Sequence, residues 1–230
     1  MKLRIQFTKH GAMKFIGHLD TMRYFQKAIR RSGIDISYTG GFSPHQIMAF
    51  AHPLGVGTES ESEIVDIEVN SLNGNRAEMT DILNAQMSEG FTIRDIRLLP
   101  DNAANAMASV AAASYSVRII SSGPQIDYER AVKAILDKEE VLILKKTKKS
   151  ETMTDIRPRI YKLSYRDECI HMCVDASSAG NVKPEHVINA LYQAEENALF
   201  DGRLKIVRNE IYGRLDSGEL IPLIDLGTDF

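Results

Sequence analysis

Two cysteines and six histidines are the side chains of this sequence best suited to metal binding or proton transfer. Cys169 and Cys173 lie four residues apart on a predicted strand, where both share one face but do not close around a zinc ion as a tight turn does. An iron–sulfur cluster with one open iron needs three thiolates, and the chain has two cysteines. We therefore expect two small core side chains here, and neither a metal nor a cofactor.

The histidines give a weaker signal for catalysis. His18 begins a predicted helix and projects on the side of Phe25 and Ile29, which favours a half-buried structural role. His45 and His52 fall in a Gly/Pro-rich segment at 40–60, where functional side chains often gather, and a functional role for one of them is an even alternative. The sequence contains no H-E-x-x-H motif, Walker loop or nucleophile elbow. It therefore offers no classical nucleophile or metalloprotease site.

Positive charge is concentrated in two places, although the chain has a net charge of −3. On the predicted helix, four cations form one stripe opposite Phe25: Arg23, Lys27, Arg30 and Arg31. The second group spans a predicted turn and the strand after it: Lys145, Lys146, Lys148, Lys149, Arg157 and Arg159. Such segregation in an acidic chain is typical of a surface that meets phosphates, although any helix also has a solvated face.

Periodic patterns predict the elements that would position these residues. In the first half we expect strands at 2–8, 34–39, 46–51, 64–69 and 91–99, and helices at 18–33 and 76–87. The first helix would end at Gly33 and bury Leu19, Met22, Phe25 and Ile29. In the second half we expect strands at 114–120, 141–147, 156–163, 169–175 and 203–212. Two further helices would begin after Asp127 and at Pro184. Residues 213–230 give no clear pattern.

Each half thus has the element order β-α-β-β-α-β, with one extra short strand in the first. This order is that of the ferredoxin-like split βαβ motif. We predict an α+β protein made of two tandem ferredoxin-like sandwiches with antiparallel sheets, in residues 1–100 and 114–230. The alanine-rich segment at 100–113 would connect them. The duplication rests on element order, because no residue-level repeat is visible.

The apolar runs, the first residues and the cysteine content indicate where in the cell the protein is expected. No apolar run approaches the roughly 20 residues that a membrane helix needs, and the first residues lack the apolar core of a signal peptide. Two cysteines in 230 residues are few for a secreted, disulfide-bonded chain. We therefore expect a cytoplasmic protein without a membrane partner.

Several short motifs point to one family. The first run contains F-x-G-H-L-D, then R-R-x-G, then G-F-x-P-H, then P-L-x-x-G. Its residues are Phe15, Gly17, His18, Leu19, Asp20, Arg30, Arg31, Gly33, Gly41, Phe42, Pro44, His45, Pro53, Leu54 and Gly57. The second half adds the lysines at 146–149 with Asp155, Ile156, Arg157, Pro158, Lys183 and Pro184. These segments resemble the radical-SAM-linked protein family of bacteria, whose members occur beside or fused to a cobalamin-type radical-SAM protein.

The basic clusters suggest an RNA-binding protein, and the resemblance adds a radical-SAM partner without implying an established activity. Our leading hypothesis is an accessory protein that presents RNA, a tRNA or rRNA, to that partner for modification. Phosphate contacts would come from Arg23, Lys27, Arg30, Arg31, Lys146, Lys148, Lys149 and Arg157. A specific pocket would be lined by His18, Asp20, Phe42 and His45. One alternative is a metal-independent, endoribonuclease-like enzyme with His18 or His45 as general acid or base. Another is a protein-interaction module without RNA contact, and a non-catalytic partner is favoured over an enzyme.

Overall fold

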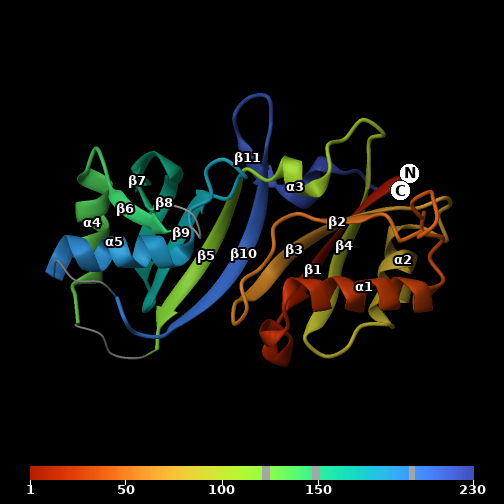
Figure 1. Cartoon of the computed structure of the whole chain (residues 1–230), viewed down its shortest axis with the longest axis horizontal. Coiled ribbons are helices and arrows are strands. Elements are labelled where there is room, and N and C mark those ends of the chain that lie inside the picture. The colour runs from red at the N-terminus through yellow and green to blue at the C-terminus, as the bar shows by residue number, and fades with distance from the viewer. Residues whose placement is uncertain (121–124, 147–150, 197–199) are drawn as a thin grey trace. The chain divides into compact units, whose positions relative to one another are not determined.

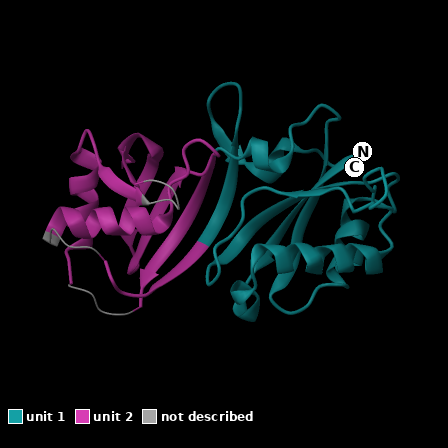
Figure 2. Cartoon of the chain, in the orientation of Figure 1, with its two compact units in different colours: residues 1–111, 208–230 teal, residues 112–207 magenta. Residues whose placement is uncertain are grey.

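A computed structural model describes residues 1–120, 125–146, 151–196 and 200–230 of the chain. These residues form two compact units (Figure 2): unit 1 comprises 1–111 and 208–230, and unit 2 comprises 112–207. The expected division at 100–113 is thus incomplete, because the C-terminal segment returns to unit 1. None of the helices in the described residues is long and apolar enough to cross a membrane.

Unit 1 contains an antiparallel sheet and two main helices (Figure 1). Its elements are β1 (Lys2–Lys9), η1 (Gly11–Phe15), α1 (His18–Ser32), β2 (Met48–Phe50), β3 (Glu59–Glu68), α2 (Arg76–Asn84), β4 (Phe91–Leu99), α3 (Ala106–Ser109), β11 (Leu220–Pro222) and η3 (Leu223–Leu226). β1 lies between β4 and β3, and β2 pairs with β3; all three pairings are antiparallel. The C-terminal part of β10 (Leu204–Arg214) also belongs to this unit and neighbours β3.

One face of this sheet packs against α1 and α2. Leu3, Ile5 and Phe7 alternate along β1 toward this face, and they share one core with Phe25 of α1 and Leu83 of α2. The ring of Phe7 lies 4.4 Å from that of Phe25, and further aromatic rings surround it. The period-two and period-3.6 patterns of the sequence therefore produced the expected core.

The first helix departs from the expected pattern at one residue. Phe25 and Ile29 are buried and Met22 is partly buried, whereas Leu19 is 60% exposed. At 100° per residue Leu19 lies about 120° from Phe25, outside the buried stripe. The inclusion of Leu19 in the apolar face was wrong, and Thr21 occupies the buried position in that turn.

Unit 2 has its own antiparallel strands and two helices. Its elements are β5 (Ala112–Ile119), α4 (Tyr128–Asp137), β6 (Leu142–Lys146), β7 (Glu151–Asp155), η2 (Arg157–Arg159), β8 (Ile160–Arg166), β9 (Cys169–Asp175) and α5 (Pro184–Glu196). β9 pairs with both β5 and β8, and β6 pairs with β7 in a separate two-stranded sheet. Asp127 caps α4 by accepting a hydrogen bond from the Arg130 backbone N–H, as expected.

Mixed α+β architecture and antiparallel pairing are therefore confirmed, while some local expectations differ from the structure. The strand expected at 156–163 begins only at Ile160, because residues 157–159 form the turn η2. The segment at 34–39 forms only isolated bridges, from Ile36 to Val69 and from Tyr38 to Gln46. β7 was not expected, because its sequence ETMTD has no buried alternation and its strand pairs only with β6. The hairpin of β8 and β9 is present, and Asp167 and Glu168 turn the chain with positive φ angles.

The C-terminus of α1 gives a first testable prediction. Gly33 ends the helix with φ of +74°, in the left-handed region that penalises a Cβ atom. Replacing Gly33 with alanine should lower the free energy of unfolding by about 1 kcal/mol, measured by urea denaturation. Gly17→Ala is the matched control, because Gly17 precedes the same helix with φ of −76° and no atom would crowd its Cβ. Equal losses in the two variants would contradict the assignment.

Candidate functional site

A buried charged cluster lies on the helix-covered face of the unit 1 sheet. Glu63 on β3 is 5% exposed, and Arg208 on β10 is 2% exposed. The Arg208 Nη1 donates to Glu63 Oε1 at 2.8 Å and to the His52 carbonyl at 3.0 Å. Its Nη2 contacts His52 Nδ1 at 2.9 Å, which requires that nitrogen to accept the hydrogen bond. His52 is thereby fixed with its proton on Nε2.

Lys9, the last residue of β1, adds a second buried cation beside this pair. Its side chain follows Leu3, Ile5 and Phe7 on the inward face of the strand, and the residue is 2% exposed. The Nζ donates to the Ile16 carbonyl at 2.8 Å, just before α1 begins. The register between β1 and β3 shifts between Phe7, which pairs with Glu63, and Lys9, which pairs with Ser60. Because Glu63 pairs with Phe7 and Lys9 follows Phe7 by two residues, Lys9 and Glu63 lie on the same face of the sheet.

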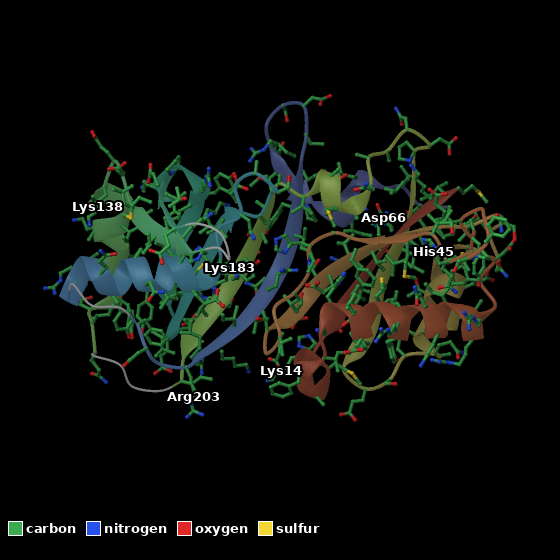
Figure 3. The ribbon with its side chains drawn as sticks, viewed as in Figure 1. Lys14, His45, Asp66, Lys138, Lys183 and Arg203 are labelled. Carbon is green, nitrogen blue, oxygen red and sulfur yellow. The ribbon has the colours of Figure 1, made fainter. Side chains whose placement is uncertain are left out.

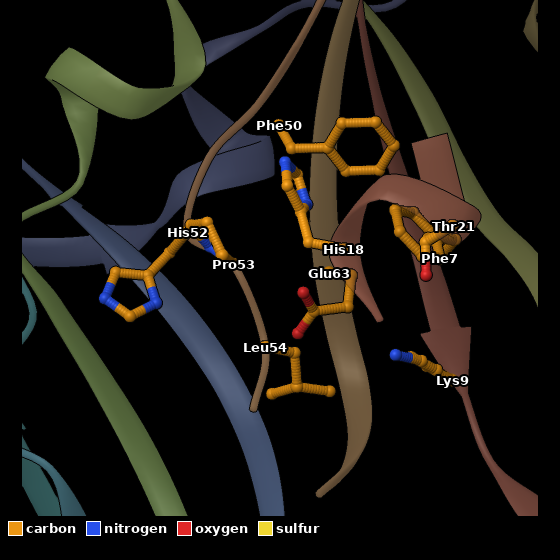
Figure 4. Close-up of a pocket in the computed structure, with 9 residues that line it drawn as sticks. All are labelled: Phe7, Lys9, His18, Thr21, Phe50, His52, Pro53, Leu54 and Glu63. Atoms are coloured by element: carbon orange, nitrogen blue, oxygen red, sulfur yellow. The ribbon is translucent and has the colours of Figure 1, made fainter. Parts of the chain in front are cut away.

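A small hollow opens above these charges (Figure 4). It is lined by Phe7, Lys9, His18, Thr21, Phe50, His52, Pro53, Leu54 and Glu63. His18 begins α1, and its ring meets Phe50 edge-on with centroids 5.3 Å apart. The cavity volume is about 10 Å³, close to the minimum for one water molecule. Only a single small group can therefore enter its enclosed part.

Burial changes the proton affinity of the two oppositely charged groups. Desolvation raises the pKa of Glu63 above its ordinary value, although Arg208 and the Ser60 hydrogen bond oppose that shift. Desolvation also lowers the pKa of Lys9, with Glu63 opposing and Arg208 adding to the effect. Both shifts disfavour the charged form of a buried group. The hollow therefore carries groups whose protonation a bound ligand would alter.

The four residues expected to line one pocket do not come together. His18 lines the hollow, whereas Asp20 is exposed and pairs with Arg23 at 3.3 Å. Asp20 lies about 140° around α1 from Phe25, which turns it away from the sheet. Phe42 is fully exposed, and His45 is exposed with Nδ1 3.1 Å from the Thr39 hydroxyl. The hollow therefore includes His18 but not Asp20, Phe42 or His45, and a specific pocket formed by all four residues stays a prediction.

His45 lies toward the other end of α1 from His18. Its neighbour Gln46 donates a hydrogen bond to the Gln26 carbonyl in the second half of α1, at 3.2 Å. In Figure 3 His45 lies near the C-terminal half of α1, whereas Lys14 of η1 lies near the N-terminal end of that helix. The loop from Gly40 to His45 is therefore separate from the hollow.

The cation stripe on α1 is exposed along its whole length. Arg23, Lys27, Arg30 and Arg31 are all exposed, on the side opposite Phe25. Arg23 pairs with Asp20, and Arg31 donates to the Gln86 carbonyl at 3.0 Å. Lys27 and Arg30 have no hydrogen bond or ion pair with any described residue. We call these four residues the α1 cation face.

The second basic group is only partly described. Lys148 and Lys149 lie outside the described residues, and Lys146 ends β6 with no described side chain. Arg157 does not project freely, because its Nη2 donates to the Leu136 carbonyl at 3.0 Å. The Lys145 Nζ donates to the Asn181 carbonyl at 2.7 Å. The α1 cation face belongs to unit 1 and this group to unit 2, so a shared surface stays a prediction.

The sequence of this chain matches one known protein family. Residues 2–184 match the family described as "Uncharacterized protein conserved in bacteria (DUF2344)". The chain belongs to this family. The match includes β1, α1 and β3, which carry Lys9, His18 and Glu63, but it ends before Arg208. No curated protein matches the chain.

Among solved structures, the chain is similar to one chain of a structure titled "Crystal Structure of a Cbf5-Nop10-Gar1 Complex". The TM-score is 0.46 at 10% sequence identity, with 91% of this family member covered. The alignment covers 48% of the other chain, so this protein spans about half of that chain's length.

Three residues of the buried charged cluster, Lys9, Glu63 and Arg208, were missed in the sequence, although a signal for two of them was present. Lys9 continues the inward series of Leu3, Ile5 and Phe7, and Glu63 precedes the inward Val65. A charged residue in phase with a core series is a candidate for a buried functional group. Arg208 had no such signal, because its burial depends on the pairing of β10 with β3.

No group of three or more His, Cys, Asp or Glu side chains in the described ranges is arranged to hold a metal ion. Cys173 is buried and Cys169 is partly buried on β9.

Proposed function

We propose that this protein binds RNA, and that it does so through the α1 cation face. The observation that carries the proposal is the exposure of four cations on one side of a single helix, in a chain with net charge −3. Asp20 is the one carboxylate within α1 itself. A positive surface on an acidic protein concentrates a polyanion locally without giving the whole molecule a basic character. A tRNA or rRNA is the class of RNA that we propose as the substrate.

The energetic basis is the release of counterions from the nucleic acid. Each neutralised phosphate of a single strand contributes about −0.7 to the slope of log K against log salt. Four contacts would therefore give a slope near −3, and affinity would fall steeply between 50 and 200 mM salt. Phosphate contacts position the strand but do not read its sequence. We expect similar affinity for RNAs of different sequence on this face alone.

Charge reversal at Lys27 and Arg30 tests the proposal, because neither side chain holds another described residue in place. The variant Lys27→Glu/Arg30→Glu should weaken RNA retention at least tenfold at low salt and make the salt slope shallower by about 1.4. Binding is measured by fluorescence anisotropy with a labelled single-stranded RNA at several salt concentrations.

The control is Lys133→Glu/Lys138→Glu, which changes the net charge equally but on unit 2. Both lysines are exposed near Asp137, Glu139 and Glu140, so this surface is already acidic. Unchanged RNA affinity in the α1 variant, or equal losses in the two variants, would reject the α1 cation face. RNA length is checked in parallel, since cleavage that His18→Ala abolishes would favour the endoribonuclease-like alternative.

We further propose that a radical-SAM protein is the partner, and that the pair acts in RNA modification in the cytoplasm. This part is supported by the GHLD and G-F-x-P-H motifs and by the family resemblance that they carry. The test is a crosslinked purification of the tagged full chain that sequences bound RNA and identifies bound protein. Recovery of RNA without any radical-SAM protein would leave RNA binding intact but reject the partner.

The tandem ferredoxin-like interpretation belongs to the same proposal. It is supported in unit 1 by the strand sequence β4-β1-β3-β2 and by helices α1 and α2 on one face. In unit 2 it is supported by the sequence β5-β9-β8 with α4 and α5. The ferredoxin-like fold serves many unrelated functions, so it is compatible with the proposed role without specifying it.

A further inference from the structure

Two aromatic side chains of unit 1 are presented to solvent by a short hairpin beside α1. Tyr38 is 47% exposed and Phe42 is fully exposed. Neither ring contacts another aromatic ring or a cation in the part of the chain that the structure describes. The rings of Phe7 and Phe25, by contrast, lie in the core of the same unit. The two exposed rings therefore contribute nothing to that core and are free to meet a ligand.

The hairpin spans residues 37–47, and its geometry decides which side chains share a face. Two backbone hydrogen bonds flank the bridge between Tyr38 and Gln46, which makes these residues a non-hydrogen-bonded pair. The side chains of such a pair leave the same face and lie close together. His45, one position along, is on the opposite face. Phe42 lies at the tip of the hairpin.

The Gln46 side chain holds the hairpin against α1. It donates to the Gln26 carbonyl at 3.2 Å, and in an α-helix that carbonyl also accepts the N–H of Arg30. Tyr38, as the partner of Gln46, therefore lies beside the turn of α1 that carries Arg30. At 100° per residue, Arg30 and Arg23 lie about 40° and 60° further round the helix than Gln26. Tyr38 thus borders the α1 cation face.

This surface carries no negative charge of its own. Residues 37–47 contain no Asp or Glu, and neither do residues 21–32 of α1. The hairpin therefore adds aromatic surface beside the cations without opposing them. Proteins that hold single-stranded nucleic acid combine cations that follow the backbone with aromatic rings on which the bases stack. A duplex keeps its bases paired and stacked inside, so it would leave such rings unused.

We propose that Tyr38 and Phe42 form a stacking platform for unpaired bases, so that the RNA bound at the α1 cation face is a single-stranded segment. The inference rests on the proposed function, because the phosphates of that segment would contact the α1 cation face. Every base has a π-face, so the platform selects unpaired RNA and not a particular sequence. We call Tyr38 and Phe42 the aromatic platform.

Comparison of a single strand with its duplex tests the aromatic platform. Binding of the full chain is measured by fluorescence anisotropy with a labelled RNA of about ten nucleotides, alone or annealed to its complement. Phosphate contacts alone would favour the duplex, because its charges are more densely spaced. We expect the single strand to bind at least about fivefold more tightly than the duplex at the same salt concentration. A duplex that binds as tightly as the single strand overturns the proposal.

Substitution of Phe42 separates stacking from charge. Phe42→Ala and Phe42→Leu should each weaken binding of the single strand at least about fivefold, because leucine keeps apolar bulk but has no π-face. Both variants should leave duplex binding and the salt slope unchanged, since no charge is removed. Phe42 is fully exposed, so neither change disturbs the core. Affinity retained in Phe42→Leu but lost in Phe42→Ala would refute stacking in favour of an apolar contact.

Two further substitutions complete the set. Tyr38→Ala should weaken the single strand in the same way, whereas Tyr38→Phe keeps the ring and should change its affinity less than about twofold. Phe15→Ala is the matched control, because Phe15 is a 66% exposed phenylalanine of η1, before the other end of α1. Equal losses in Phe15→Ala and Phe42→Ala would reject the assignment of stacking to the hairpin.

Fluorescence gives a direct readout of stacking. The chain contains no tryptophan, so Phe42→Trp introduces a unique indole. An indole stacks on bases as a phenyl ring does, so this variant should bind the single strand as tightly as the unaltered protein. A base stacked on the indole quenches its emission. Saturating single-stranded RNA should therefore quench Phe42→Trp but not Phe15→Trp, and RNA bound without quenching of Phe42→Trp would overturn stacking there.

The outcomes keep the aromatic platform apart from the proposed function. Lys27→Glu/Arg30→Glu should weaken both single strand and duplex and make the salt slope shallower, which the platform variants should not do. A loss in this charge variant without any loss in Phe42→Ala and Tyr38→Ala rejects the platform and leaves RNA binding by the α1 cation face intact. Absence of RNA binding by the unaltered protein at low salt rejects both, and a protein partner would then be the remaining occupant of the exposed rings.

Discussion

Replacing Arg208 by methionine is expected to lower the free energy of unfolding by about 3–5 kcal/mol, because it leaves a buried carboxylate without its counter-ion. Arg208 is 2% exposed and binds both Glu63 and the backbone and ring of His52. Lys9 is too far away to form an ion pair with Glu63 in its present position. Urea denaturation followed by circular dichroism measures the loss.

The loss should depend on pH in a definite direction. Arg208 opposes the upward shift of the Glu63 pKa, so its removal raises that pKa further. A carboxyl whose pKa is higher in the folded than in the unfolded chain binds more protons when folded. The contribution of this carboxyl to the free energy of unfolding is then fully present below its pKa in the unfolded chain, which is about 4.3. That contribution is lost as the pH rises through its higher pKa in the folded chain. The deficit of Arg208→Met should therefore be smaller at about pH 5 than at about pH 8.

Arg214→Met is the control for this experiment. Arg214 lies on the same strand but is exposed, and its Nη1 donates to the Gly218 carbonyl at 2.7 Å. The same substitution there should change stability by less than about 1 kcal/mol. A loss in Arg208→Met no larger than in Arg214→Met, at both pH values, would mean that the buried pair has little effect on stability.

The sequence predicted the hollow only in part, for a geometric reason. Helical periodicity correctly turned His18 toward Phe25, and Asp20 could have been excluded by the same 100° rotation. The motif grouped His18, Asp20, Phe42 and His45 because they are near in sequence. In the fold, Phe42 and His45 sit on an exposed loop whose position depends on contacts such as that of Gln46 with α1. A shared motif does not imply a shared cavity.

The domain boundary and the unassigned tail show what a local pattern cannot reveal. β10 starts in unit 2 and ends in unit 1, so the chain after Val207 returns to strands more than a hundred residues earlier. Residues 223–226 form η3, which packs on β1 and β4. Leu223 is fully buried there. No periodicity within 213–230 could have indicated these long-range contacts.

The C-terminal segment 213–230 covers part of the outward face of β1, where its η3 packs. Arg4 and Asp66 alternate with the inward residues of β1 and β3 and so lie on the other face of the sheet. Both are buried, with Arg4 1% and Asp66 7% exposed. Arg4 donates from Nε and Nη2 to the two Asp66 oxygens at 2.8 Å each, and from Nη1 to the Leu223 carbonyl at 3.1 Å. This bidentate pair therefore links the sheet to the C-terminal segment.

Asp66→Asn is expected to lower the free energy of unfolding by about 3–5 kcal/mol, since it leaves the Arg4 guanidinium buried beside an amide. Glu61→Gln removes one negative charge from the same strand, where Glu61 pairs with Arg94 at 2.7 Å and both side chains are about half exposed. That control should cost less than about 1 kcal/mol. Hydrogen exchange should also show faster exchange of η3 in Asp66→Asn, because Arg4 would lose the partner that holds it against Leu223. Equal stability of the two variants in urea, with unchanged exchange of η3, would contradict this role of the pair.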